Sequence, residues 1–490
     1  MVQIPVGQWN PDLPDLATSG SNEALNVIPA SESYKPFPSF GPVSNALTAR
    51  CQGAIFVRKT DGTGIIFAGD ATKLYRLAGS TFSDVSRVAG GAYTTPADGV
   101  WTFTQFGPNI LATNGYDAYQ TFNIDTDANF SALAGTPPIP LYACIAGDFV
   151  MTLNQGIARN RVQWCAINNS ADWVTSQQTQ ASRQDLPDGG WGMGIIGSEY
   201  AATIFQEFAI RRASYEGPPL IFRFAKISEN LGLTIPGALA NYRDLIFFVD
   251  RSGFYMLQGG VQITPIGEQL VNNTFWRLLD QTNLPRVSSA IDPTNGIYAV
   301  AFPDTNATAG TPNHMFIYHW PTQRWAHVQP GVLEMIFSAA SQVGYTLDGL
   351  DAITTNLDAL PFSLDSAVWT GIARRLLGGF DTTHRMGFFS GPALAPTVDT
   401  TEAELSSRIV RVRSARPEVD GGTPSVTLGL RNRQMDPVVW GSAVAVNAIG
   451  TCPQNSAGRF FRGRITLPAS QTWTHIIGLD DLDAKPEGRQ

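Results

Sequence analysis

Short apolar runs that alternate with turn-forming residues dominate the middle of the chain. In each unit, a run such as GIIFAG (64–69) ends at a polar or glycine-containing turn, and a second apolar run follows. Alternating apolar and aromatic residues bounded by Asp, Asn or Gly indicate antiparallel β-hairpins. Such segments are found at residues 64–77, 109–122, 148–164, 200–212, 244–260, 297–320 and 344–355.

The turns of these hairpins recur at a regular interval. They are 40–54 residues apart and begin near Asp70, Asn114, Asn154, Gln206, Asp250, Asp304 and Asp348. A repeat of this length is typical of β-propeller blades, which bury their faces only when several of them stack in a ring. We therefore predict an all-β protein in which residues 46–373 form a β-propeller of six to eight blades, with seven favoured. A sandwich or two smaller β domains are the alternatives.

One helix is predicted within this region. Residues 272–282 place Phe275, Leu278 and Leu279 at helical spacing. The first 45 residues differ from the rest, because seven prolines precede residue 45 and few apolar positions are periodic. Proline fixes φ and biases the preceding residue towards extended structure. We predict an extended arm at 1–45 that lies against another surface.

Beyond residue 373 the charge changes sign. Residues 374–490 have a net charge of +3 against −11 for residues 1–373, which together give the −8 of the whole chain. Strands are predicted at 404–415, 425–434 and 458–468, and each contains an Arg-x-Arg pair that alternation places on one face. The pairs are Arg411 and Arg413, Arg431 and Arg433, and Arg462 and Arg464. We predict a separate antiparallel, β-sandwich-like domain at 374–490 with one exposed basic face.

Residues suited to catalysis are sparse. The chain contains no nucleophile elbow, zinc-protease motif, P-loop or dinucleotide-binding motif. The segment GWGMG (190–194) has no phosphate-binding lysine, so it indicates a turn between strands. The carboxylates Asp70, Asp250 and Asp348 lie at hairpin turns, where hydrogen bonds to the backbone account for them better than glycoside hydrolysis does.

Metal and disulfide chemistry are also disfavoured. His314 and His319 differ by an odd number on a predicted strand and would face opposite ways, which argues against a metal site with His327. The cysteines have no metal-binding spacing and are expected to be buried and reduced: Cys51, Cys144, Cys165 and Cys452. The N-terminus has neither the charged nor the apolar region of a secretory signal, and no apolar run is long enough to span a membrane. We predict no catalytic residue, metal, cofactor or membrane insertion, and therefore a protein that is not an enzyme.

Several motifs, in order, resemble a known family of viral proteins. They are NVIP and YKPFPSFGP (26–42), RVQWCAINNSADW (161–173), the long course of 191–217 and 222–271, and FIYHWPTQRWAHV (316–328). This order is similar to that of the tail nozzle, or plug, proteins of short-tailed bacteriophages, also called packaged-DNA stabilisation or head-completion proteins. The resemblance covers roughly residues 1–350 and departs at Cys165, where the family pattern has Ser. The C-terminal domain matches only in kind.

The resemblance implies a structural virion protein, assembled in the bacterial cytoplasm and located in the tail. It implies a ring of copies of this chain, a hexamer, that continues the DNA channel below the portal and adaptor. Such a ring retains packaged DNA, conducts it at ejection, and lies near needle, fibre or spike proteins. On this interpretation Trp9, Tyr34, Phe37 and Phe40 dock on a neighbouring subunit or adaptor. The six arginines named above then lie at an assembly interface.

Physical chemistry agrees with this interpretation but leaves others open. Basic residues lining a conduit would bind DNA phosphates and hinder passage, whereas an acidic or neutral bore would not. The alternatives are a propeller that binds or hydrolyses host glycans, and a cellular scaffold of the kelch or WD type. The chain has no regular kelch or WD blade signature, which counts against the scaffold. Three roles are open for the basic face: an ordinary solvated surface, a contact with an acidic protein partner, or direct binding of DNA.

Overall fold

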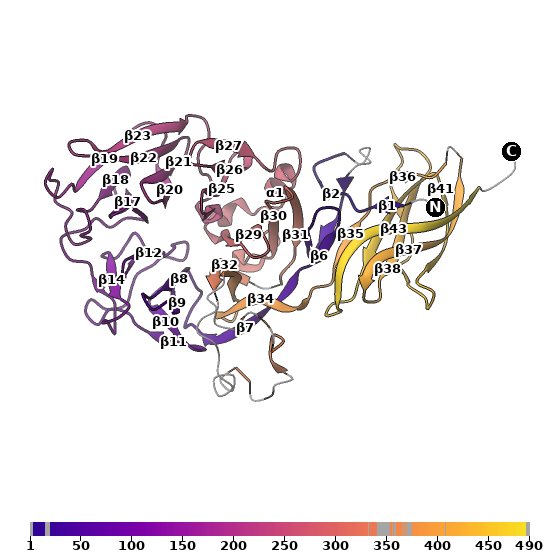
Figure 1. Ribbon diagram of the computed structural model, residues 1–490, viewed down its shortest axis with the longest axis horizontal. Helices are drawn as coiled ribbons and strands as arrows, with labels where there is room; N and C mark the ends of the chain where they lie inside the picture. Colours follow the sequence, from indigo (N-terminus) through magenta and orange to yellow (C-terminus); the bar gives the residue numbers. More distant parts are fainter. Residues whose placement is uncertain are drawn as a thin grey trace.

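The computed structural model describes residues 3–14, 20–331, 333–340, 353–354, 356, 359–364, 366, 368–369, 375–406 and 408–486. In these residues the fold is almost entirely β and has two lobes, a ring of small sheets and a β-sandwich (Figure 1). Short helices occur at η1 (Pro236–Ala238), α1 (Asn272–Leu278), η2 (Gln281–Arg286) and η3 (Thr308–Gly310). The predicted helix at 272–282 corresponds to α1. No helix of the described residues is long and apolar enough to cross a membrane.

The ring begins with three consecutive antiparallel sheets of four strands. Blade 1 consists of β8 (Gly53–Arg58), β9 (Gly64–Gly69), β10 (Leu74–Ala78) and β11 (Thr81–Asp84). Blade 2 consists of β12 (Thr102–Phe106), β13 (Asn109–Thr113), β14 (Gln120–Asn123) and β15 (Ser131–Ala132). Blade 3 consists of β16 (Tyr142–Ala146), β17 (Phe149–Gln155), β18 (Ala158–Trp164) and β19 (Ser182–Asp185). In each blade the second and third strands form a predicted hairpin.

Three further blades continue the ring. Blade 4 consists of β20 (Gly192–Gly197), β21 (Ala201–Gln206), β22 (Ile210–Gly217) and β23 (Ile221–Ser228). Blade 5 consists of β24 (Ala240–Tyr242), β25 (Leu245–Asp250), β26 (Gly253–Gln258) and β27 (Gln262–Pro265). Blade 6 consists of β28 (Ser288–Asp292), β29 (Ile297–Phe302), β30 (His314–His319) and β31 (Arg324–Val328). Blade 6 differs from the others because its sheet continues beyond β31 to a total of eleven strands.

Blade 7 closes the ring with strands from both ends of the chain. It consists of β32 (Leu333–Ala340), β33 (Arg375–Asp381), β34 (Arg385–Ala393) and β7 (Pro38–Ala46). Phe389 pairs with Phe40, and Gly387 pairs with Pro42. A side chain at Gly387 would approach the carbonyl oxygen of Gly41 to 2.1 Å, so only glycine permits this close pairing.

The innermost strands place the blades in one ring. β8 lies next to β12, β12 next to β16, β16 next to β20, β24 next to β28, β28 next to β32, and β32 next to β8. Blades 4 and 5 meet through the Phe205 and Phe248 rings, 5.2 Å apart. The fold is therefore a β-propeller, with six separate four-stranded sheets and the β28–β31 unit of the larger sheet. These seven units fall within the predicted range.

The sandwich contains two sheets. The first has the order β41 (Cys452–Gly458), β37 (Val410–Gly421), β43 (Trp473–Pro486), β6 (Tyr34–Pro36) and β5 (Val27–Pro29), with β1 (Ile4–Pro5) also paired to β43. The second continues from β31 through β4 (Ala24–Leu25), β35 (Thr397–Asp399), β42 (Phe460–Thr466), β38 (Ser425–Arg431) and β39 (Val439–Trp440), with β36 (Ala403–Glu404) and β40 (Val444–Ala445) at its edges. Val412, Leu428 and Phe461 fill the space between the sheets.

The N-terminal residues are built into both lobes rather than forming a free arm. β1 and β6 pair with β43, β4 joins β31 to β35, and β2 (Gln8–Trp9) pairs in parallel with β3 (Gly20–Ser21). Figure 1 shows these indigo strands running from the propeller into the sandwich. One continuous apolar core includes Trp9 of the arm, Trp325 of blade 6 and Phe461 of the sandwich.

Two predicted boundaries shift as a result. The propeller extends to Ala393 instead of 373, because β33 and β34 belong to blade 7. Residues 38–45, assigned to the arm, form most of the closing strand β7. The hairpin predicted at 344–355, with its turn near Asp348, lies outside the described residues apart from positions 353 and 354.

Candidate functional site

The acidic residues at the hairpin turns serve the turns themselves. Asp70 accepts hydrogen bonds from the backbone N–H groups of Thr72 and Lys73, both at 2.8 Å, and from the Tyr75 hydroxyl at 2.8 Å. Asp250 accepts from the backbone N–H of Ser252 at 3.1 Å. These two carboxylates belong to blades 1 and 5, and each bonds the turn that follows it, as the sequence indicated. Each also accepts one hydrogen bond from a more distant segment, Asp70 from the Thr48 hydroxyl and Asp250 from the Gly232 N–H.

Of the three histidines weighed as metal ligands, two form a pair and one lies apart. His314 Nδ1 and His327 Nε2 are 2.7 Å apart in the buried interior, while His319 contacts the Thr322 hydroxyl at 2.6 Å. Burial lowers the pKa of His327 to about 3, with a smaller contribution from His314, and burial also lowers the pKa of His314. In the described residues, no group of three His, Cys, Asp or Glu side chains is placed to hold a metal ion.

The aromatic residues predicted to dock on a neighbour are used inside this chain. Trp9, Tyr34 and Phe37 are buried, and Phe40 packs against Phe389 with ring centroids 5.4 Å apart. The Tyr34 hydroxyl donates to the carbonyl of Gly7 at 2.9 Å. The prediction of an intersubunit role is wrong for Trp9, Tyr34 and Phe37, because these side chains are buried within this chain. For Phe40, which is half-buried on β7, it stays a prediction.

The predicted basic face is divided between exposed and buried arginines. Val410 and Val412 are buried while Arg413 is exposed, so alternation on β37 follows the prediction, and Arg411 is half-buried beside Asn455. β38 ends at Arg431, so the exposed Arg433 lies in the following turn rather than on the strand.

The remaining arginines pair with acidic residues that the prediction did not include. Arg431 and Arg462 are 4% and 3% exposed, and both contact the buried carboxylate of Glu402, at 2.5 and 3.2 Å. Arg464 donates two hydrogen bonds to Asp399, at 2.7 and 2.9 Å. The prediction that Arg431 and Arg462 lie on an exposed face is wrong. The segment from β35 to β36 pairs with β42 and places the Glu402 carboxylate against both arginines.

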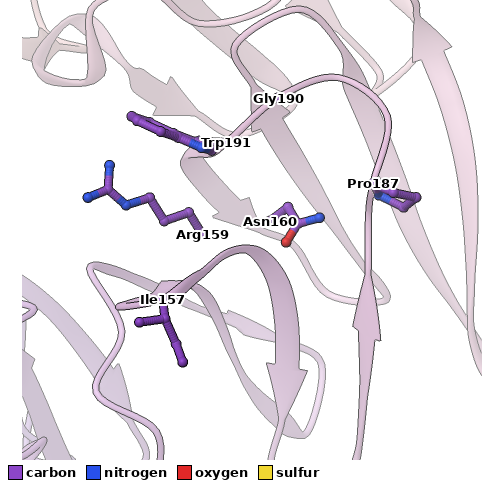
Figure 2. Close-up of a pocket in the computed structure, with 6 residues that line it drawn as sticks. All are labelled: Ile157, Arg159, Asn160, Pro187, Gly190 and Trp191. Carbon is purple, nitrogen blue, oxygen red and sulfur yellow. The ribbon is translucent and has the colours of Figure 1, made fainter.

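An open pocket lies where blades 3 and 4 meet, at the end of blade 3 that carries the β17–β18 turn. It has a volume of about 450 Å³ and is lined by Ile157, Arg159, Asn160, Pro187, Gly190 and Trp191. Figure 2 shows Arg159 extending beside Trp191, with Ile157 on the turn below them. The Arg159 guanidinium lies 4.2 Å from the centroid of the Trp191 ring, which is a favourable cation–π distance.

Hydrogen bonds hold the loop that carries Trp191. The Trp191 N–H donates to the Glu207 carboxylate at 3.1 Å, and the Glu207 N–H donates to the Trp191 carbonyl at 3.1 Å. Asn160 donates to the Leu186 carbonyl at 3.2 Å at the base of the same loop. Trp191 is therefore fixed in position although half of its surface, 50%, is exposed.

A second exposed aromatic residue lies in the β21–β22 turn of blade 4, beside an arginine of blade 5. Phe208 is 44% exposed, and the Arg251 guanidinium lies 4.8 Å from its ring centroid. We call Ile157, Arg159, Trp191, Phe208 and Arg251 the aromatic–arginine patch. Trp, other aromatic residues and Arg are enriched at the centres of protein interfaces. Sequence analysis missed the patch. The turn predicted at GWGMG (190–194) is only partly right, because Gly190 and Trp191 precede a strand but Gly192–Gly194 begin β20. A tryptophan in a glycine-rich segment was the available signal.

Comparisons with known proteins identify neither a family nor a function for this chain. No protein-family profile and no curated protein match the sequence. Among solved structures, a chain of the mitotic checkpoint complex has 7% identity and a TM-score of 0.39, and the alignment covers 71% of this chain and 95% of that one. The computationally designed Ika8 protein has 7% identity and a TM-score of 0.37, with 75% and 96% covered. Likeness at this level does not inform on function.

Proposed function

We propose that this chain is a structural subunit of a bacteriophage tail rather than an enzyme. In this proposal, copies of the chain form a nozzle ring, a hexamer, that continues the DNA channel below the portal and adaptor. The ring retains packaged DNA, conducts it at ejection, and lies near needle, fibre or spike proteins in the virion. The identification as a nozzle rests on the sequence resemblance in residues 1–350.

The observation that carries an assembly role is the aromatic–arginine patch. A fixed, half-exposed tryptophan covered by an arginine and adjoining a fully exposed isoleucine has the composition of an interface centre. The joint between the lobes supports the same role, because a subunit of a conduit must transmit force without hinging. Arg413 and Arg433 remain exposed for contacts with acidic neighbours, where complementary charge favours a defined register.

Electron microscopy of the tagged chain, isolated from the cells or particles that produce it, tests this function. We expect six-fold rings around a channel, stacked on a larger portal-like assembly. The double variant Ile157→Asp, Trp191→Ala should reduce ring formation and leave the melting temperature unchanged. Val261→Asp, at another exposed apolar position, is the matched control and should assemble normally. If the double variant forms as many rings as the wild type, the aromatic–arginine patch does not lie at the interface between subunits.

The pocket also favours a second candidate, recognition of a host glycan. An exposed indole next to the Asn160 amide and the Arg159 guanidinium provides an apolar platform beside hydrogen-bond donors, which suits a sugar ring. A glycan array decides between the two functions. Glycan recognition would be favoured by two results together: the wild-type chain binds a glycan and Trp191→Ala does not, and electron microscopy finds no rings of the chain.

A further inference from the structure

A second pocket lies at the opposite end of β17 from the aromatic–arginine patch. It has a volume of about 590 Å³, and its lining includes Asp148, Phe149, Glu199, Tyr200 and Tyr215, with Ile145 and Ile167 beside them. The residues come from the turn between β16 and β17, the turn between β20 and β21, the end of β22 and, for Ile167, the turn that follows β18. None of the proposed roles described above uses this site.

Backbone contacts preform the pocket. The Gly147 N–H donates to the Ser198 carbonyl at 3.1 Å and thus joins the two turns. The Tyr215 N–H donates to the Tyr200 carbonyl at 3.1 Å, and its hydroxyl donates to Gln180 at 2.8 Å. A Cβ at Gly197 would lie 1.7 Å from the Ile145 carbonyl oxygen, so the innermost strands of blades 3 and 4 are in close contact there. A ligand would therefore meet an ordered site.

The lining combines aromatic rings with negative charge. Phe149 and Tyr215 have ring centroids 5.5 Å apart, and Tyr200 is 70% exposed. Asp148 and Glu199 are exposed beside them, and no lysine, arginine or histidine is among the lining residues. A hydrogen bond to Glu199 and the charge of Glu199 raise the pKa of Tyr200, with smaller contributions from burial and from the charge of Asp148.

Aromatic rings and carboxylates share one kind of ligand. The face of an aromatic ring attracts a cation, and carboxylates accept its N–H groups. We propose that this pocket binds a cationic side chain, an arginine, presented by a protein partner. The charge of the lining selects against carboxylates and phosphates, and the open mouth between two turns fits a side chain projecting from another surface.

The test uses the full chain with ¹³C-methyl isoleucine and three soluble probes. Acetyl-Gly-Arg-Gly-amide is titrated to about 10 mM, which covers the millimolar dissociation constant expected for one such contact. We expect the Ile145 and Ile167 methyl signals to shift, whereas the citrulline peptide, which is neutral but similar in shape, should bind at least about tenfold more weakly. Absence of shifts, or equal shifts with citrulline, would overturn the proposal. Tighter binding of choline than of the arginine peptide would overturn the assignment to a protein partner.

Variants locate the site. Asp148→Asn with Glu199→Gln should weaken binding of the arginine peptide about tenfold, and Tyr200→Leu about fivefold, because these side chains are exposed and can change without unfolding. Tyr116→Leu, an exposed tyrosine in the β13–β14 turn, is the matched control and should leave the titration unchanged. Unchanged affinity in both pocket variants would refute the site, whatever the outcome for ring assembly.

Discussion

Leu25 and His327 are partners in a parallel β pairing, and this pair joins a propeller blade to the sandwich. His327 lies on β31, the outermost strand of blade 6, and Leu25 lies on β4, which then pairs with β35. Trp9 stacks on the His327 ring at 5.8 Å and covers the joint. Backbone pairing and a shared apolar core thus connect the two lobes, whereas a flexible linker would allow relative motion.

Arg324 anchors the N-terminal segment at this joint. It is 8% exposed and donates to the carbonyls of Ala30, Ser31 and Gly7 at 2.8, 3.0 and 2.7 Å. We expect Arg324→Ala to lower the free energy of unfolding by about 3 kcal/mol, because it removes three hydrogen bonds from one charged side chain, including that to the buried Gly7 carbonyl. Urea denaturation measures this loss, and limited proteolysis should cut the N-terminal segment first. Arg413→Ala is the exposed control, and an equal effect in both variants would contradict the anchoring role.

Glu402 should be among the most sensitive positions in the sandwich. Its carboxylate is buried between Arg431 and Arg462. We expect Glu402→Gln to cost about 3–5 kcal/mol, because it removes the buried negative charge that both guanidinium groups contact. Glu404→Gln, which alters the exposed pair with Arg459, should cost less than about 1 kcal/mol. Chemical denaturation of both variants gives the comparison, and similar losses would refute the argument.

The buried histidine pair predicts loss of stability in mild acid. The pKa of His327 is lowered to about 3 in the folded protein, whereas an unfolded histidine titrates near about 6.5. The contribution of neutral His327 to the free energy of unfolding is complete above the pKa of the unfolded residue and is lost as the pH falls towards 3. By pH 5 we expect a loss of about 2 kcal/mol from this residue, and His314 acts in the same direction. The variant His327→Gln should show a smaller dependence of unfolding free energy on pH; an unchanged slope would contradict this account.

Glu23 should make the protein less stable as the pH rises, which is opposite to the effect of the histidine pair. Burial, and then repulsion from Asp399, raises its pKa to about 7, although Arg464 acts against the shift. The folded state holds the proton while the unfolded carboxyl ionises near about 4.5, so this contribution is complete below that pH and is lost as the pH rises towards 7. Glu23→Gln, a neutral replacement, should raise the free energy of unfolding by about 2 kcal/mol at pH 8 relative to wild type and change little at pH 4. Glu32→Gln, at an exposed site, should have no effect at either pH.

Local patterns predicted the blades, because each blade is built from neighbouring segments. Six of the seven hairpins occur where alternation and turn residues placed them, and Asp70 shows the reason, since it bonds the turn that follows it. Blade 7 escaped prediction because β7 and β34 are far apart in sequence and meet only in the fold. The packing partners of the aromatic side chains were predicted wrongly for the same reason. Trp9 and Tyr34 are residue types that are common at protein interfaces, but the surface that they cover belongs to this chain.

The charged residues show a second limit. Alternation correctly separated Val412 from Arg413 on β37, but it could not show that Glu402 lies beside Arg431 and Arg462. Which arginines remain exposed depends on pairing between distant strands. The aromatic–arginine patch was missed for a related reason, since the exposure of Trp191 is set by how two blades meet.

The closing strand β7 also sets the order in which the molecule can be completed during synthesis. Residues 38–46 leave the ribosome early, but their partner strand β34 is made only after the first six blades. β1 and β6 remain without their partner strand for longer still, because that partner is β43 near the C-terminus. A nascent chain that stops before β34 holds a row of unpaired backbone groups on an open ring, and such edges favour association with other chains. Interrupted translation would therefore yield aggregation-prone chains.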